Sequence, residues 1–203
     1  MELDHFLQLI RFDLAMKEEI LKGNALLEAY PKHRHYLNNA KYYLLNTEEW
    51  GIYELKLFSR VAVSLEPSIT WHCLKLALRK SERYASIPGN KLLIYETLTT
   101  VFSIFCLFKE KRYATKTLAV WKAQIYQEEN VEQAIFLPFY EGWIAWLKQE
   151  NEQAAALMDR TLGYLETLNL SKTATEYSEL KRLILADNFP GIIFHDPLLE
   201  KLS

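Results

Sequence analysis

The chain has 203 residues, half of them apolar, with six glycines, six prolines and a formal net charge of -2. This composition indicates a globular protein, of a size that suits one large domain or one repeat array, and excludes a disordered chain. The acidic balance argues against a free-standing nucleic-acid-binding surface, and no apolar run reaches the ~20 residues of a membrane-spanning helix.

The two cysteines and the N-terminal segment favour a cytoplasmic protein. Cys73 and Cys106 lie far apart, each in apolar company, which is typical of reduced core residues. Residues 1–13 are amphipathic and carry acidic side chains, so they do not form a secretory signal.

The first half of the chain is predicted to be helical. Apolar residues recur at three- and four-residue steps over residues 3–22, 31–45, 47–65 and 69–84. Pro31 is expected in the first turn of its helix, where the missing N–H costs nothing. Asn46 is expected to cap the helix over 47–65, with Glu49 reaching back to form a capping box.

The second half continues the pattern after a loop expected at residues 87–90. Further helices are predicted over residues 91–109, 112–127, 131–148, 152–169 and 173–186. No segment is predicted as a strand, because the β-prone residues 97–100 lie inside a helical period. Residues 188–203 form the predicted C-terminal tail, with a turn and a short last helix from Pro197.

The stretch from Phe139 to Leu168 suggests how these helices pair. Aromatic residues share one face of its first helix, and a polar break of three residues forces the next helix to run antiparallel. Gly142 lies among the bulky residues and costs the helix roughly 1 kcal/mol against alanine, which predicts close approach of the neighbouring helix there. Such a helical hairpin is typical of tetratricopeptide-like (TPR-like) repeats, which bury their apolar faces only against further repeats.

We therefore predict an all-α protein. Residues 1–187 would form one right-handed α-solenoid of about five TPR-like hairpins, followed by the tail.

The segments W50-G-I-Y-E-L-K-L-F-S-R60, F139-Y-E-G-W and Ala154–Leu168 resemble the C-terminal regulatory half of the Rgg/GadR/MutR transcription regulators. The resemblance covers most of the chain and is best from Leu37 to Asp187. It implies a superhelical repeat domain that dimerises and, in many members, binds a short signalling peptide on its concave face. Those regulators also carry an N-terminal helix-turn-helix.

No helix-turn-helix segment precedes the repeats in this sequence. We therefore expect either an excised regulatory domain or a protein that has lost its DNA reader, and no direct DNA contact by these residues. The role that remains is ligand sensing and dimerisation, with a short peptide or a protein segment as partner and with no membrane contact.

Catalysis and metal binding find no support in the sequence. His33 and His35 project about 200° apart on a helix and are interpreted as surface residues. His195 and Asp196 are adjacent, a spacing that seldom orients a base, and no glycine-rich phosphate loop occurs. We expect no enzyme activity and no cofactor.

Three arginines are candidate peptide ligands. Arg79 and Arg83 are four residues apart on one helix face, where they either complement the helix dipole or clamp a peptide carboxylate. The resemblance gives support to the second role, because related regulators hold their peptides partly through arginines on an inner helix, and the dipole role stays the alternative. Arg60 follows largely apolar positions and either faces the groove or pairs with Glu54 or Glu96.

Tyr95, Tyr140 and Trp143 are candidates for an aromatic groove wall, and core packing is the alternative that we favour for each. Two functions stay open: a peptide-sensing regulatory domain, or a TPR-like scaffold that binds a partner protein without a signalling ligand. A groove with few polar groups among apolar walls would favour the first function, and an open, highly charged concave face the second.

Overall fold

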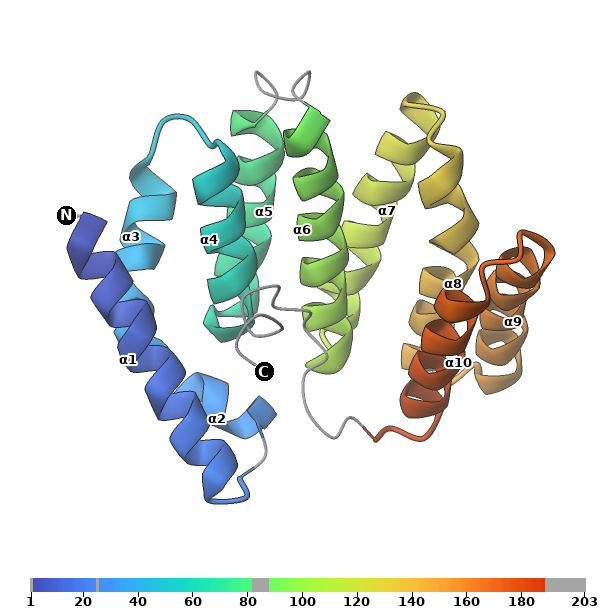
Figure 1. The fold of residues 1–203 in the computed structure, drawn as a ribbon, viewed down its shortest axis with the longest axis horizontal. Coiled ribbons are helices and arrows are strands. Elements are labelled where there is room, and N and C mark those ends of the chain that lie inside the picture. Colours follow the sequence, from blue (N-terminus) through green and yellow to red (C-terminus); the bar gives the residue numbers. More distant parts are fainter. Residues whose placement is uncertain (1, 25, 82–87, 189–203) are drawn as a thin grey trace. The chain divides into compact units, whose positions relative to one another are not determined.

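The computed structural model describes residues 2–24, 26–81 and 88–188, and these residues form helices without any strand (Figure 1). They divide into two compact units, unit 1 up to Thr100 and unit 2 from Val101 onward. The prediction of an all-α protein is confirmed. The right-handed solenoid and the single repeat domain over residues 1–187 stay predictions, and the helix expected from Pro197 lies outside the described residues.

Unit 1 is built from short and long helices around an apolar core. Its elements are α1 (Glu2–Leu21), α2 (Leu26–Lys32), the 3-10 helix η1 (Arg34–Leu37), α3 (Asn38–Asn46), α4 (Ile52–Val61), the 3-10 helix η2 (Ala62–Ser64), α5 (Pro67–Lys80) and the first part of α6 (Pro88–Leu107). Leu44, Trp50, Phe58 and Leu74 are fully buried in its core.

Two prolines lie in different places from those predicted. Pro31 is inside α2, near its end, so the helix expected over 31–45 is broken into η1 and α3. Pro88 begins α6, so residues 88–90 are helical and not part of a loop. Pro88 agrees with the rule that proline is tolerated in the first turn of a helix. Pro31 lacks the N–H that would continue the hydrogen-bond ladder of α2, and this helix ends one residue later.

The helix predicted from Asn46 begins five residues later. Asn46 is the last residue of α3, and its side-chain amide donates to the Tyr42 carbonyl at 2.7 Å. The capping carboxylate is Glu54, not Glu49: its Oε2 accepts the Gly51 N–H at 2.8 Å at the start of α4. The segment between α3 and α4 is hydrogen-bonded to the end of α5: the Trp50 N–H donates to the Lys80 carbonyl at 3.4 Å.

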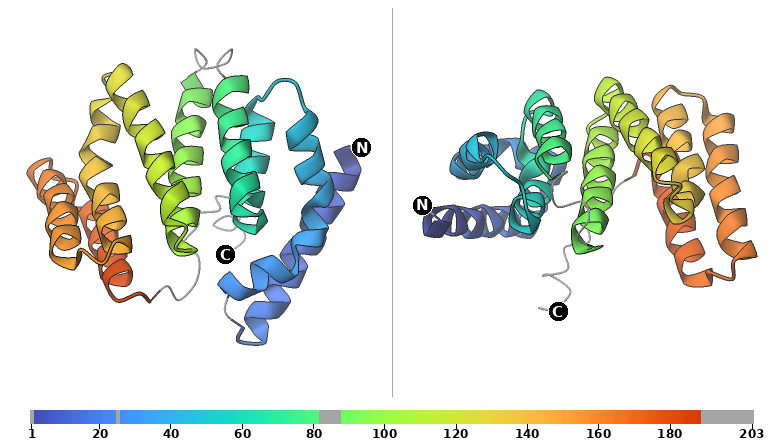
Figure 2. Two further views of the ribbon diagram at one scale, coloured as in Figure 1. Left: turned by 180° about the vertical axis from the view of Figure 1, so that it is seen from behind. Right: turned by 90° about the horizontal axis from the view of Figure 1, so that it is seen from above.

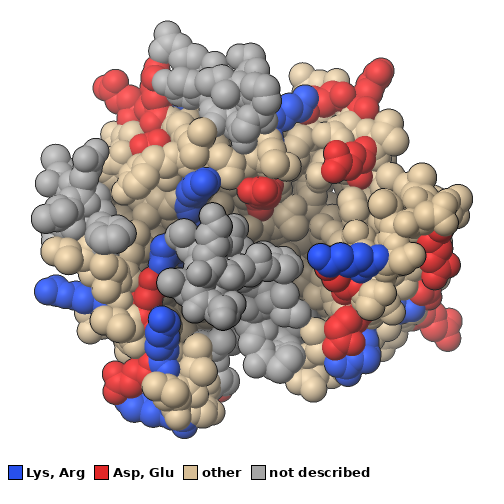
Figure 3. All heavy atoms as spheres, viewed as in Figure 1, with Lys and Arg blue, Asp and Glu red and all other residues tan. Residues whose placement is uncertain are grey.

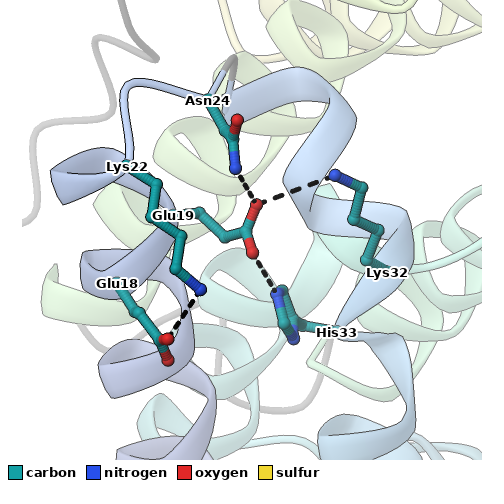
Figure 4. A network of polar contacts seen from close by, with 6 residues as sticks. All are labelled: Glu18, Glu19, Lys22, Asn24, Lys32 and His33. Carbon is teal, nitrogen blue, oxygen red and sulfur yellow. Dashed lines mark hydrogen bonds and ion pairs between the residues drawn. The ribbon is translucent and has the colours of Figure 1, made fainter.

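Polar contacts centred on Glu19 join the end of α1 to α2 and η1 (Figure 4). Its carboxylate accepts from the Asn24 amide at 2.9 Å and lies 3.7 Å from Lys32 Nζ and 3.4 Å from His33 Nε2. The Asn24 bond is the main cause that lowers the pKa of Glu19. His33 is therefore half-buried in an interface and is not the plain surface residue that we predicted, whereas His35 is exposed.

Unit 2 consists of the end of α6 followed by four regular helices, which lie side by side in Figures 1 and 2. These are α7 (Lys111–Gln127), α8 (Val131–Leu147), α9 (Asn151–Thr167) and α10 (Ser171–Leu185), all within about two residues of the predicted bounds. Each helix packs against the next along the chain. The expected antiparallel neighbours are thus present in this unit.

The turns of unit 2 repeat one conformation every 20 residues. Lys109, Glu129, Gln149 and Asn169 each follow a helix with φ between 50° and 68°, in the left-handed region. The residue after each donates its N–H back across the turn; Glu150 N–H, for example, bonds the Ala145 carbonyl at 3.0 Å. This is the Schellman geometry, formed here without the usual glycine.

Gly142 marks the closest approach of α8 and α9. A Cβ placed on it would lie 2.8 Å from the Ala154 carbonyl oxygen and 2.8 Å from Met158 Cγ. Ala154 and Met158 are themselves completely buried. The prediction that this glycine admits a neighbouring helix is therefore confirmed.

Candidate functional site

The aromatic candidates of unit 2 lie inside its core. Tyr140 and Trp143 are 5% and 2% exposed, and both rings contact Phe102, at centroid distances of 5.4 and 5.9 Å. The Tyr140 ring also lies 4.5 Å from that of Trp121, and its hydroxyl shares a hydrogen bond of 2.9 Å with Tyr177. This packing fits the core role that we favoured, and a groove-wall role would require these rings to be uncovered.

The remaining candidates belong to unit 1. Tyr95 is buried, at 3% exposure, while Arg79 is exposed near the end of α5. Arg60 pairs with Asp13 of α1, so the partners predicted for it, Glu54 and Glu96, are wrong. Asp13 is 47 residues away in the sequence and was not considered, and only the fold of unit 1 brings the two side chains together. Arg83 lies outside the described residues.

Unit 2 contains a shallow, open pocket. It has a volume of about 250 Å³ and opens between α7, α8 and α9. The apolar side of the lining consists of Leu118, Ile144, Ala145 and Leu157, and the polar side of Glu141, Lys148, Glu150 and Gln153.

Regular helix geometry places these residues together. Ile144 and Ala145 lie three and four residues after Glu141, and Lys148, the residue after α8, lies seven after it, so the four share one face. The left-handed turn at Gln149 then reverses the chain and brings Glu150 to the rim, next to the first turns of α9.

The polar groups at the rim differ in how firmly they are held. Glu141 accepts a hydrogen bond from Lys122 at 2.5 Å, which is the main cause that raises the pKa of that ammonium group. Lys122 Nζ also lies 5.8 Å from the centre of the Tyr126 ring. In the described part of the chain, the side chains of Lys148, Glu150 and Gln153 form no hydrogen bond or ion pair, so they are available to a ligand.

This arrangement suits recognition of one or two side chains of an extended partner. Small-molecule pockets usually measure ~300–1,000 Å³, so the volume favours an aliphatic side chain over a complete small ligand. The rim offers an ammonium group, a carboxylate and an amide, which match the carbonyl and amide groups of a peptide. No group of three metal-ligating side chains occurs in the described residues.

The sequence did not reveal this pocket. Its lining comes from three helices, and the residues on each read as ordinary amphipathic positions. The one available signal was the pairing of α8 with α9 around Gly142, which fixes both helices but does not indicate which face stays hollow.

Charge on the molecular surface is mixed. On the face drawn in Figure 3, Lys and Arg side chains are interspersed with Asp and Glu. Among the described residues, no helix combines the length and the apolar run that crossing a bilayer requires.

Comparison with known proteins gives one family. The model of the C-terminal domain of the HTH-type transcriptional regulator Rgg matches residues 16–179, which is most of the chain. No curated protein matches.

Proposed function

Because this chain belongs to the family of the Rgg C-terminal domain, we propose that it is a ligand-sensing and dimerisation domain that binds a short signalling peptide. The family match over residues 16–179 carries the proposal, since it covers α2 to α9 and parts of α1 and α10. We place the protein in the cytoplasm and assign it no enzyme activity, as befits a domain that regulates transcription.

The unit 2 pocket is our candidate anchor for the peptide. An aliphatic peptide side chain would enter between Ile144 and Leu157, and Lys148 and Gln153 would donate to peptide carbonyl groups. Peptide recognition commonly combines such apolar pockets with polar contacts to the main chain. Arg79, exposed in unit 1, is a separate candidate for binding a carboxylate and is no part of the unit 2 pocket.

Ligand binding can change a regulator only if it favours one conformation over another. We propose that the peptide shifts the placement of helical hairpins or of protomers, which an attached DNA-reading domain would follow. DNA would thus be contacted by that domain and not by these residues.

The alternative function is a protein-interaction scaffold. The openness of the pocket and its charged rim favour this reading, because a folded partner would cover such a surface more fully than a short peptide. Affinity selection of random octapeptides on the intact chain distinguishes the two. The regulator proposal predicts enrichment of one related set of peptides, and the scaffold predicts no enrichment.

A further inference from the structure

Helix α1 has apolar residues on two opposite faces. Leu9, Phe12 and Met16 are buried in unit 1, where the Phe12 ring lies 6.1 Å from that of Tyr30. On the outer face, four large side chains are exposed by 39% to 88%, namely Leu7, Ile10, Leu14 and Leu21. A surface helix of a globular protein normally shows one apolar stripe, so this second one, here called the outer stripe, requires a separate explanation.

The outer stripe has the spacing of a coiled-coil seam. Leu7, Ile10, Leu14, Lys17 and Leu21 follow one another at alternating steps of three and four residues. This is the repeat with which two helices interdigitate their side chains. Lys17 is exposed and takes one seam position, where its long aliphatic stem can cover apolar surface while the ammonium group stays in water.

The charges beside the stripe decide how a second helix can approach. On one flank, Asp13 is already paired with Arg60 of α4, so its charge is neutralised within unit 1. The other flank, here called the open flank, carries Arg11 and Glu18. Arg11 has no ion-pair partner in the described residues, and Glu18 forms an ion pair there only with the exposed Lys22, at 2.6 Å.

This distribution matches a second copy of the same helix running antiparallel. Two antiparallel copies bring their open flanks together, so Arg11 of each lies near the partner's Glu18, which gives two equivalent ion pairs around a two-fold axis. In a parallel arrangement, the open flank of each copy would instead face the Asp13 flank of the other. Glu18 would then lie near the partner's Asp13, and the two carboxylates would repel each other.

We propose that the outer stripe of α1 is a docking surface for a second copy of this chain, packed antiparallel around a two-fold axis. The inference rests on the dimerisation part of the proposed function and is independent of peptide binding. A seam of about four turns buries less than the ~1,600 Å² of a standard interface, so on its own it gives weak association, micromolar or weaker.

Sedimentation velocity of the intact chain over a wide micromolar range tests the proposal. We expect reversible dimers, and we expect Leu14→Glu to weaken dimerisation by ~10-fold or more, since a carboxylate would be buried in the seam. Leu168→Glu is the matched control, because Leu168 is 51% exposed on unit 2 and its replacement should leave the dimer unchanged. Melting curves of both variants report whether each still folds.

Charge reversal tests the orientation. Arg11→Glu and Glu18→Arg should each weaken the dimer, and the double variant should restore it, because the two ion pairs are then reversed. A chain that stays monomeric throughout overturns the inference, as does a dimer that Leu14→Glu leaves intact. The second result would refute this surface while leaving dimerisation itself standing, and peptide binding by the same variants would be measured separately.

Discussion

Gly142 of α8 lies so close to the Ala154 carbonyl of α9 that a Cβ on the glycine would be 2.8 Å from that oxygen. The obstacle is partly backbone, which cannot turn aside as a flexible side chain can. Helix α9, and with it one wall of the unit 2 pocket, therefore keeps its position only if residue 142 has no side chain.

We predict that Gly142→Ala lowers the free energy of unfolding. Overpacking costs about 1–3 kcal/mol, and the better helix propensity of alanine returns about 1 kcal/mol, which leaves a net loss of up to about 2 kcal/mol. Gly163→Ala is the matched control on α9, because nothing lies within 4 Å of its added Cβ. That change should raise the stability, and equal effects of the two changes in urea denaturation would contradict the close packing described.

Gln149→Gly should stabilise the protein. Gln149 has φ of 68°, a conformation that costs a residue with a side chain roughly 1–2 kcal/mol and costs glycine nothing. The gain is reduced by the greater freedom of glycine in the unfolded chain, so we expect about 0.5–1 kcal/mol in denaturant unfolding. Lys148→Gly, one residue earlier with φ of -88°, should destabilise instead.

Stability should fall at alkaline pH partly through Tyr43. Burial and the hydrogen bond that its hydroxyl donates to Glu54 Oε1 at 2.6 Å raise its pKa to about 12. An unfolded tyrosine titrates near ~10, so this contribution is complete below that pH and is lost as the pH rises through about 12.

Tyr43→Phe therefore should lose less stability than the parent protein between pH about 9 and about 11, as measured by urea unfolding at each pH. Burial also raises the pKa of Tyr30 to about 12, so a residual alkaline loss should persist in the variant. Identical pH profiles for the two proteins would exclude the role given to Tyr43.

The pairing of α8 with α9 was predictable because its signals are local: a glycine among aromatics, a short polar break and an apolar face on each side. The start of α4 was not. Asn46 with Glu49 and Gly51 with Glu54 are both capping pairs at the same spacing, so the sequence favours neither strongly. The choice is made by Trp50, which is fully buried while its N–H bonds the Lys80 carbonyl, a tertiary contact across 30 residues.

The candidate site shows the same limit. Aromatic residues such as Tyr140 read equally as core or groove until their neighbours are known, and our preference for the core was based on how often aromatics fill such interiors. The pocket depends on the relative placement of Leu118, Ile144 and Leu157 on three helices. No single-helix pattern specifies that placement.

Substitution in the pocket should weaken peptide binding without unfolding the domain. Leu157 is half-buried on α9, so Leu157→Glu places a charge where we expect an aliphatic peptide side chain. We expect a loss of ~10-fold or more in affinity for a selected peptide, measured by fluorescence polarisation. Leu168→Glu, at the residue that follows α9, is the control and should bind as the parent does.

The most direct measurement for the account as a whole is the affinity selection of octapeptides on the intact chain, followed by titration of the enriched sequences. We predict one related set of peptides, bound more weakly after Leu157→Glu and unaffected by Leu168→Glu. No enriched set, or a set whose affinity Leu157→Glu does not reduce, would contradict a peptide-sensing domain with the site described.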